Sequence, residues 1–172
     1  MGKSLIVFYS WVGNTEVAAK EIQRQTGFDL QKIEEKKERK SGGNIMGAAL
    51  SAVMGFKSSI KPMDYALKDY DNIFLGVQVW AGKTTPAINK YLSKTDFKGK
   101  KVWIFITKAD AKVPQKVIDS ITGRVAKKGG KVADSISFTM AWDPKNPVLL
   151  SPEAIKDEIS EWLEKDHVQF QQ

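Results

Sequence analysis

The sequence predicts an α/β fold in which helices cover both faces of a parallel β-sheet. Short, continuous apolar runs are typical of strands buried on both faces, and three stand out: Leu5–Tyr9, Ile73–Val77 and Val102–Ile106. Segments with helical periodicity lie between such runs, and this alternation requires right-handed crossovers and a parallel sheet. The length fits a single domain over residues 1–172.

The first half of the chain predicts, in order, a strand, a turn, a helix and a second strand: Leu5–Tyr9, Ser10–Asn14, a helix from Thr15, and Phe28–Ile33. Residues 34–64 depart from this rhythm, because a charge run is followed by glycines and then by a segment of small and apolar residues. We interpret them as an insertion that carries a crossover helix from Ile45 to about Phe56.

The second half predicts a third strand with a loop, a helix, a fourth strand with an exit loop, a helix, a fifth strand and a last helix: Asn72–Val77, Gln78–Thr84, a helix from Pro86, Val102–Ile106, Thr107–Lys112, a helix through Val117 and Val125, Val132–Met140, and a helix from Pro152. Thr85 is typical of an N-cap and Pro86 of a first helical position. Residues beyond about Asp166 are expected to form a loose tail.

The composition excludes several classes of function. There is no cysteine and only one histidine, so thiol nucleophiles, disulfides and cysteine-held metal or iron–sulfur sites are excluded, and triad chemistry is disfavoured. The net charge of +7 suits an anionic partner or simply a solvated surface. Nucleic acid is not expected, because aromatic residues are not interleaved with the basic ones. No apolar segment is long enough for a signal peptide or a membrane span, so we expect a cytoplasmic protein.

Ligands of open parallel sheets bind beyond the carboxyl ends of the strands, where three loops of this chain are expected. The first comprises Ser10, Trp11, Val12, Gly13, Asn14 and Thr15. A helix that begins here offers unpaired N–H groups to an anion, and the side chains add hydroxyl and amide donors. The loop has no Lys or Arg and no P-loop pattern. It predicts a phosphate held by neutral donors, and the alternative is an ordinary strand–helix turn.

The stretch from Ile6 to Ala19 resembles the flavodoxin signature. Its required positions are occupied by Ile6, Val7, Phe8, Ser10, Gly13, Thr15 and Ala19. The resemblance implies a doubly wound, five-stranded parallel sheet in the order 2-1-3-4-5, with helices on both faces. It also implies that residues 10–15 wrap the phosphate of FMN.

The second loop is similar to the flavin-contacting stretch of short flavodoxin-like proteins. An Asp-Tyr-Asp sequence, an aliphatic strand and a Trp-Ala-Gly sequence occur between Asp69 and Gly82. The resemblance implies that Val79, Trp80, Ala81 and Gly82 line the isoalloxazine ring. Gln78, which stands where a proline is frequent, is also a candidate cofactor-binding residue. For Trp80 the alternative is plain core packing.

The third loop is the least similar to the family, which usually has small residues here. In this chain the candidate cofactor-binding residues of the loop are Thr107, Lys108, Ala109 and Asp110. The alternative to flavin contact is a solvated charged turn. If the lysines border the ring, their charge favours the reduced form, so we expect a less reducing flavin than in an acidic flavodoxin.

The resemblance implies an FMN-binding electron-transfer protein that serves redox partner proteins. No residue stands out as a dedicated acid, base, nucleophile or metal ligand, which suits a carrier. The alternative is an FMN-dependent oxidoreductase of the same fold, which transfers electrons from NAD(P)H to a quinone-type acceptor. A third hypothesis is a basic binding module that has lost the flavin.

Overall fold

The computed structural model describes residues 2–39, 45–141 and 148–165. Its sheet has five parallel strands in the order β2-β1-β3-β5-β6, which confirms the predicted topology. In that spatial order the strands are Asp29–Lys32, Ser4–Phe8, Asn72–Trp80, Lys101–Lys108 and Lys131–Thr139. A short strand that was not predicted, β4 (Lys83–Thr84), pairs antiparallel with the end of β3.

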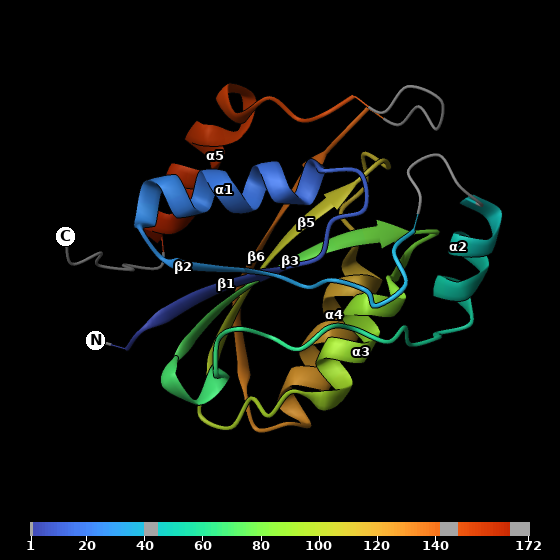
Figure 1. The fold of residues 1–172 in the computed structure, drawn as a ribbon. Coiled ribbons are helices and arrows are strands. Elements are labelled where there is room, and N and C mark those ends of the chain that lie inside the picture. The colour runs from blue at the N-terminus through green and yellow to red at the C-terminus, as the bar shows by residue number, and fades with distance from the viewer. Residues whose placement is uncertain (1, 40–44, 142–147, 166–172) are drawn as a thin grey trace.

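Helices cover both faces of the sheet (Figure 1), as the alternating pattern predicts. On one face lie α1 (Asn14–Thr26) and α5 (Pro152–Lys165), and on the other lie α3 (Pro86–Lys94) and α4 (Gln115–Ala126). Each face has its own buried apolar cluster, because successive side chains of a strand point to opposite sides. The predicted N-cap of α3 is confirmed: the Thr85 side chain accepts a hydrogen bond from the Ile88 N–H group.

Two strands extend further than the apolar runs indicate. The strand β3 continues to Trp80 and β5 continues to Lys108, because polar residues there still pair within the sheet, Gln78 with Thr107 and Lys108 with Thr139. The prediction of loops at these positions was therefore wrong at Gln78, Val79, Trp80, Thr107 and Lys108. All five residues lie on strands, where backbone pairing restricts their positions.

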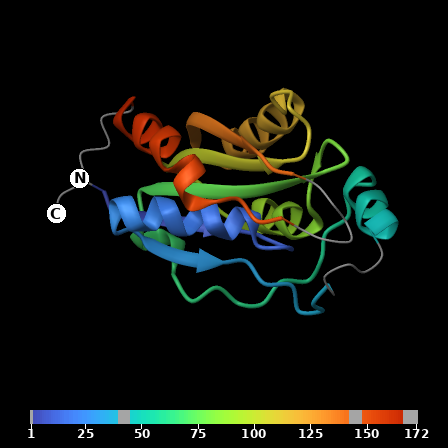
Figure 2. The ribbon, with the colours of Figure 1, turned by 90° about the horizontal axis from the view of Figure 1, so that it is seen from above.

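The insertion is closed at its base by pairing between its two ends. Glu35 and Ile60 form an antiparallel bridge, and the Lys36 N–H donates to the Ser59 carbonyl at 2.8 Å. Between these ends, α2 (Ile45–Val53) lies beyond the carboxyl end of β3 in both Figure 1 and Figure 2. It ends before the predicted Phe56, because Gly55 has a left-handed backbone (φ 67°) that terminates the helix.

A 3₁₀ turn, η1 (Leu67–Asp69), leads from the insertion into β3. The glycine-containing stretch 41–44 and the predicted tail after residue 166 lie outside the described residues. Within the described part of the chain, no helix has the length and apolar character needed to cross a bilayer.

Candidate functional site

The loop between β1 and α1 has the geometry of an anion-binding turn. Gly13 is the N-cap of α1, with a φ of 104° that favours glycine, and it offers no side-chain cap. Its N–H donates instead to Ser10 Oγ at 3.1 Å. The N–H groups of the first turn of α1 have no intrahelical acceptors, so they are available to an anion, which the helix dipole also favours.

Two predicted phosphate donors also hold the loop in place. The hydroxyl groups of Thr15 and Thr107 are hydrogen-bonded at 2.7 Å. The Asn14 carboxamide accepts the Leu150 N–H at 2.7 Å and donates to the Val148 carbonyl at 3.5 Å. The Asn14 side chain thus ties the start of α1 to residues 148–150, and the Thr15 hydroxyl ties it to β5.

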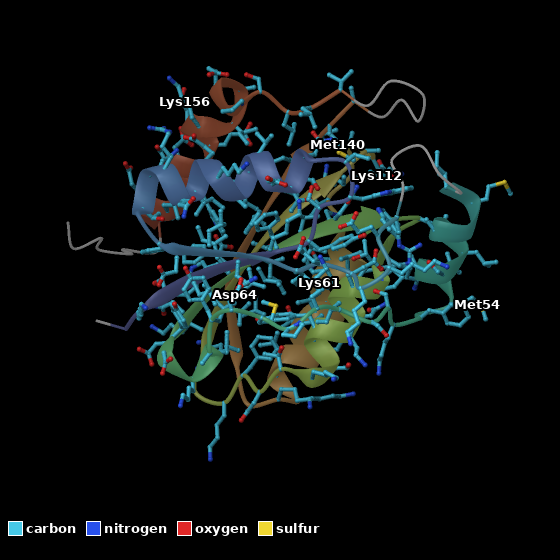
Figure 3. The ribbon with its side chains drawn as sticks, viewed as in Figure 1. Met54, Lys61, Asp64, Lys112, Met140 and Lys156 are labelled. Carbon is cyan, nitrogen blue, oxygen red and sulfur yellow. The ribbon has the colours of Figure 1, made fainter. Side chains whose placement is uncertain are left out.

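A cavity of about 200 Å³ lies beside this loop, at the carboxyl end of the sheet. All three predicted loops contribute to its wall, through Trp11, Gln78, Val79, Trp80, Ala81 and Ala109. Sequence reasoning missed four further wall residues: Ile45, Ala48 and Ala49 of α2, and Met140 after β6. The side chain of Met140 lies close to the ends of the strands in Figure 3.

Trp80 has a double role as core residue and cavity wall. Only 7% of it is exposed, and its ring makes edge-to-face contacts with Trp11 (centroids 5.1 Å apart) and Tyr9 (6.1 Å). The Arg39 guanidinium lies 5.3 Å from the Trp80 ring centroid. Trp80 thus belongs to the buried core cluster and also lines the cavity. Aromatic contacts of this kind hold Trp11 and Trp80 in fixed orientations.

A buried polar network supports the far side of Trp80. Glu35 Oε2 accepts hydrogen bonds from Tyr9 Oη at 2.8 Å and from Arg39 Nε at 2.9 Å. Burial, together with the charge of Glu35, raises the pKa of Tyr9, so the phenol stays protonated at neutral pH. The network anchors the insertion to β1 and positions Arg39 against Trp80.

Two donors on the cavity wall lack acceptors. Gln78 Nε2 and Trp80 Nε1 are buried, and neither has a hydrogen-bond partner among the described residues. The orientation of the Gln78 amide is set, because its Oε1 accepts the Trp11 N–H at 3.0 Å and its Nε2 must therefore be the free donor. A buried donor without a partner costs about 1–3 kcal/mol. Both residues belong to the cavity wall.

The amino-acid sequence matches the family model described as Flavodoxin over residues 3–166. The chain belongs to the flavodoxin family.

Neither α2 nor Met140 was assigned a site role from the sequence. The small residues at helical spacing in the insertion were the only sequence signal for the part of the cavity wall that α2 contributes.

Solved structures agree with this assignment of the flavodoxin fold. A candidate flavoprotein from Bacteroides eggerthii DSM 20697 has a TM-score of 0.76 and 19% identity, with 98% of this chain and 100% of that chain covered. A flavoprotein from Lactobacillus acidophilus NCFM, crystallised in complex with FMN, has a TM-score of 0.66 and 21% identity, with 93% and 99% covered.

Flavodoxin 1 from Bacillus cereus, in its oxidised form, has a TM-score of 0.53 and 19% identity over 97% of this chain and 99% of that chain. At these identities the neighbours establish the fold alone. No curated protein compared with the chain matches it in sequence.

The third loop of this flavodoxin is built around a buried lysine. Lys108 Nζ donates to the Asp110 carbonyl and to Thr139 Oγ1, both at 2.7 Å, and to the Ala111 carbonyl at 3.3 Å. Lys108 therefore fixes the loop from inside and is not part of the cavity wall, whereas its neighbour Ala109 is. Asp110 caps the exposed end of the turn by accepting the Lys112 N–H. Val12 and Gly82 also lie outside the wall.

Proposed function

We propose that this flavodoxin binds FMN, with the phosphate at residues 10–15 and the isoalloxazine ring against the cavity formed by Trp11, Gln78 and Trp80. The observation that carries the proposal is the pair of unsatisfied buried donors, Gln78 Nε2 and Trp80 Nε1, on an otherwise apolar wall. The oxidised ring carries carbonyl oxygens and ring nitrogens that accept hydrogen bonds. The start of α1, which has no side-chain cap, follows Trp11 in the same loop. A phosphate there can accept hydrogen bonds from backbone N–H groups.

The wall supports electron transfer rather than acid–base catalysis. FMN, when bound, accepts and donates one or two electrons; the protein holds and orients it. Among the described residues, no titratable side chain lines the cavity. A cavity of about 200 Å³ is smaller than the roughly 300–1,000 Å³ typical of pockets that enclose whole ligands, so one edge of the ring would face solvent. An exposed edge suits exchange of electrons with a redox partner protein.

An FMN-dependent oxidoreductase remains the second candidate. The observation that favours it is the apolar wall contributed by Ile45, Ala48 and Met140, which could also contact an apolar acceptor such as a quinone. Steady-state oxidation of NAD(P)H by the FMN-loaded protein, with and without a soluble quinone, distinguishes the two. A carrier shows no sustained turnover without a separate reductase, whereas an oxidoreductase does.

A comparison of FMN with riboflavin tests the proposed orientation. Riboflavin has the same ring but no phosphate. We expect FMN to bind at least about tenfold more tightly, because hydrogen bonds to a charged group contribute about 1.5–3 kcal/mol. Equal affinities in a fluorescence titration would remove the phosphate from the proposal and leave only the ring contact.

A further inference from the structure

The outward face of α2 is apolar and exposed. Met46, Leu50 and Val53 follow one another at helical spacing on this face, and Met46 is 84% and Leu50 61% exposed. Ala48 and Ala52 face the opposite way and are buried. Helix α2 contains no charged residue.

The apolar surface continues past the end of the helix. Met54 and Phe56 are 61% and 56% exposed, and Met54 lies at the outer edge of the molecule in Figure 3. We call the five residues Met46, Leu50, Val53, Met54 and Phe56 the α2 ridge. Contiguous exposed apolar patches are uncommon on monomeric soluble proteins and mark interaction sites.

A basic groove adjoins the α2 ridge. It has a volume of about 490 Å³ and runs from the end of α2 between α3 and α4. Its cations are Lys57, Lys83, Arg124, Lys127 and Lys128, and no carboxylate is present among its described lining residues. Lys57 directly follows Phe56, and Lys83 lies on β4, which α2 contacts. Val53 belongs to both the ridge and the groove, so the two surfaces are continuous.

None of the groove's cations forms an ion pair with a carboxylate among the described residues. Arg124 donates to the side chain and backbone oxygens of Asn89, which carry no charge. The groove therefore keeps its positive charge, beside a ridge of bulky apolar side chains.

We propose that the α2 ridge and the basic groove dock this protein on the surface of an anionic lipid bilayer. Interfacial helices of this kind place apolar side chains at the boundary between headgroups and acyl chains, while flanking Lys and Arg contact lipid phosphates. With nine residues, α2 lies on the membrane and does not cross it, because a span needs about 20 residues.

The charge pattern selects this occupant over a second copy of the chain. A symmetric dimer through the α2 ridge would bring two basic grooves together, and neither supplies a carboxylate from its described lining. The ridge side chains are each more than half exposed, which suits insertion into a fluid layer.

Docking has a consequence that rests on the proposed function. Ile45, Ala48 and Ala49 line the cavity from the inner side of the same helix whose outer side carries the ridge. A protein bound through the outer side of α2 therefore holds this cavity behind the helix, roughly 10 Å from the bilayer surface. An electron acceptor dissolved in the lipid, of the quinone class, would lie at that separation from the cavity.

Vesicle flotation of the full chain tests the docking itself. Vesicles of phosphatidylcholine mixed with phosphatidylglycerol are compared with vesicles of phosphatidylcholine alone. We expect binding to the anionic vesicles, reduced by added salt, and little binding to the neutral ones. Absence of binding to the anionic vesicles would overturn the proposal.

Three paired variants locate the contact. Leu50→Ser/Phe56→Ser removes apolar contacts, and Lys57→Glu/Lys83→Glu reverses charge beside the ridge. Each should reduce binding at least about tenfold, since a single lysine near an anionic surface contributes about fivefold and an inserted Leu or Phe side chain contributes at least as much. The matched control, Lys156→Glu/Lys165→Glu, changes net charge equally on α5; Lys156 lies on the side away from α2 in Figure 3. It should change binding less than about twofold by the same reasoning.

Two further results would contradict the proposal. An equal loss in the α5 control would show that binding follows net charge alone. A dimer in sedimentation that Leu50→Ser/Phe56→Ser abolishes would assign the ridge to a second copy. The thermal midpoint and the FMN affinity of each variant are measured in parallel, so that a folding defect or failure of the flavin proposal is read separately from failure of docking.

Discussion

The hydroxyl groups of Thr15 and Thr107 lie 2.7 Å apart in the interior of the protein, although 92 residues separate them in sequence. Thr15 is in the first turn of α1 and Thr107 is near the end of β5, and both are fully buried. This hydrogen bond ties the proposed phosphate loop to the strand that leads into Ala109 of the cavity wall. The first and third ligand-facing segments are therefore fixed relative to each other before a ligand binds. This order lowers the entropic cost of binding.

Isosteric substitutions separate the two roles of this pair. Thr15→Val and Thr107→Val each break the same hydroxyl contact and should each lower the free energy of unfolding by about 1–3 kcal/mol. Both variants should weaken FMN because both lose the bond that orders the loop, and Thr15→Val should do so about fivefold more, because only Thr15 lies in the phosphate loop. Urea unfolding and FMN titration measure the two effects. Equal losses of FMN affinity would assign the pair a purely structural role.

Gln78→Met should weaken FMN about tenfold, because it removes the free Nε2 donor and the acceptor that holds the Trp11 N–H. The chain offers a matched control in Gln31, which is also buried and also accepts a loop N–H, that of Asp64, at 3.0 Å. Gln31→Met should reduce stability and leave FMN affinity unchanged. If both variants bind FMN like the wild type, the Gln78 amide does not meet the ring.

Trp80→Phe tests the second unsatisfied donor. The variant keeps an aromatic ring but lacks the indole N–H, so FMN and riboflavin should both bind less tightly, by a similar factor of about five. Thr15→Val should affect FMN alone, since riboflavin has no phosphate. Both ligands are titrated into both variants. An unaltered affinity of Trp80→Phe for riboflavin would show that the isoalloxazine ring does not contact Trp80.

Asp29 links the start of β2 to the region before β3, and its contribution should depend on pH. A hydrogen bond from Tyr70 Oη at 2.7 Å, together with Lys3, holds the pKa of Asp29 below its ordinary value of 3.8. A lowered folded-state pKa stabilises the protein above pH 3.8, and this contribution disappears as pH falls through the folded value. Because solvent screens this partly exposed pair, Asp29→Asn should reduce stability by less than about 1 kcal/mol at neutral pH. The difference in stability between Asp29→Asn and the wild type should be smaller at acidic pH than at neutral pH. An equal difference at the two pH values would contradict a role for the Asp29 charge.

The sheet and its covering helices could be predicted from the sequence because buried parallel strands leave continuous apolar runs. Leu5–Tyr9 and Val102–Ile106 are such runs, and their strands begin one residue before the predicted starts. The strand ends were underestimated because polar residues such as Gln78 and Thr107 carry no apolar signal, while their backbones still pair.

The cavity wall was predictable only where a local motif marks it. Trp11 and Trp80 follow apolar runs in recognisable motifs, and both line the cavity. Ala48 and Met140 come from an insertion and from the end of the last strand, and tertiary folding alone brings them to the wall. The atomic partners of polar groups also depend on tertiary contacts: Lys108 belongs to the loop interior, and Asn14 is bound to residues 148–150.

The visible absorption spectrum of the purified protein, recorded after addition of FMN and removal of free ligand, tests the central claim most directly. We predict a retained flavin spectrum with one FMN per chain and quenched tryptophan fluorescence, because Trp11 and Trp80 line the cavity. Loss of quenching in Trp80→Phe would attribute part of that signal to the site. A protein that retains no flavin at micromolar concentration and shows no quenching would contradict the proposal that this cavity and the loop at residues 10–15 together bind FMN.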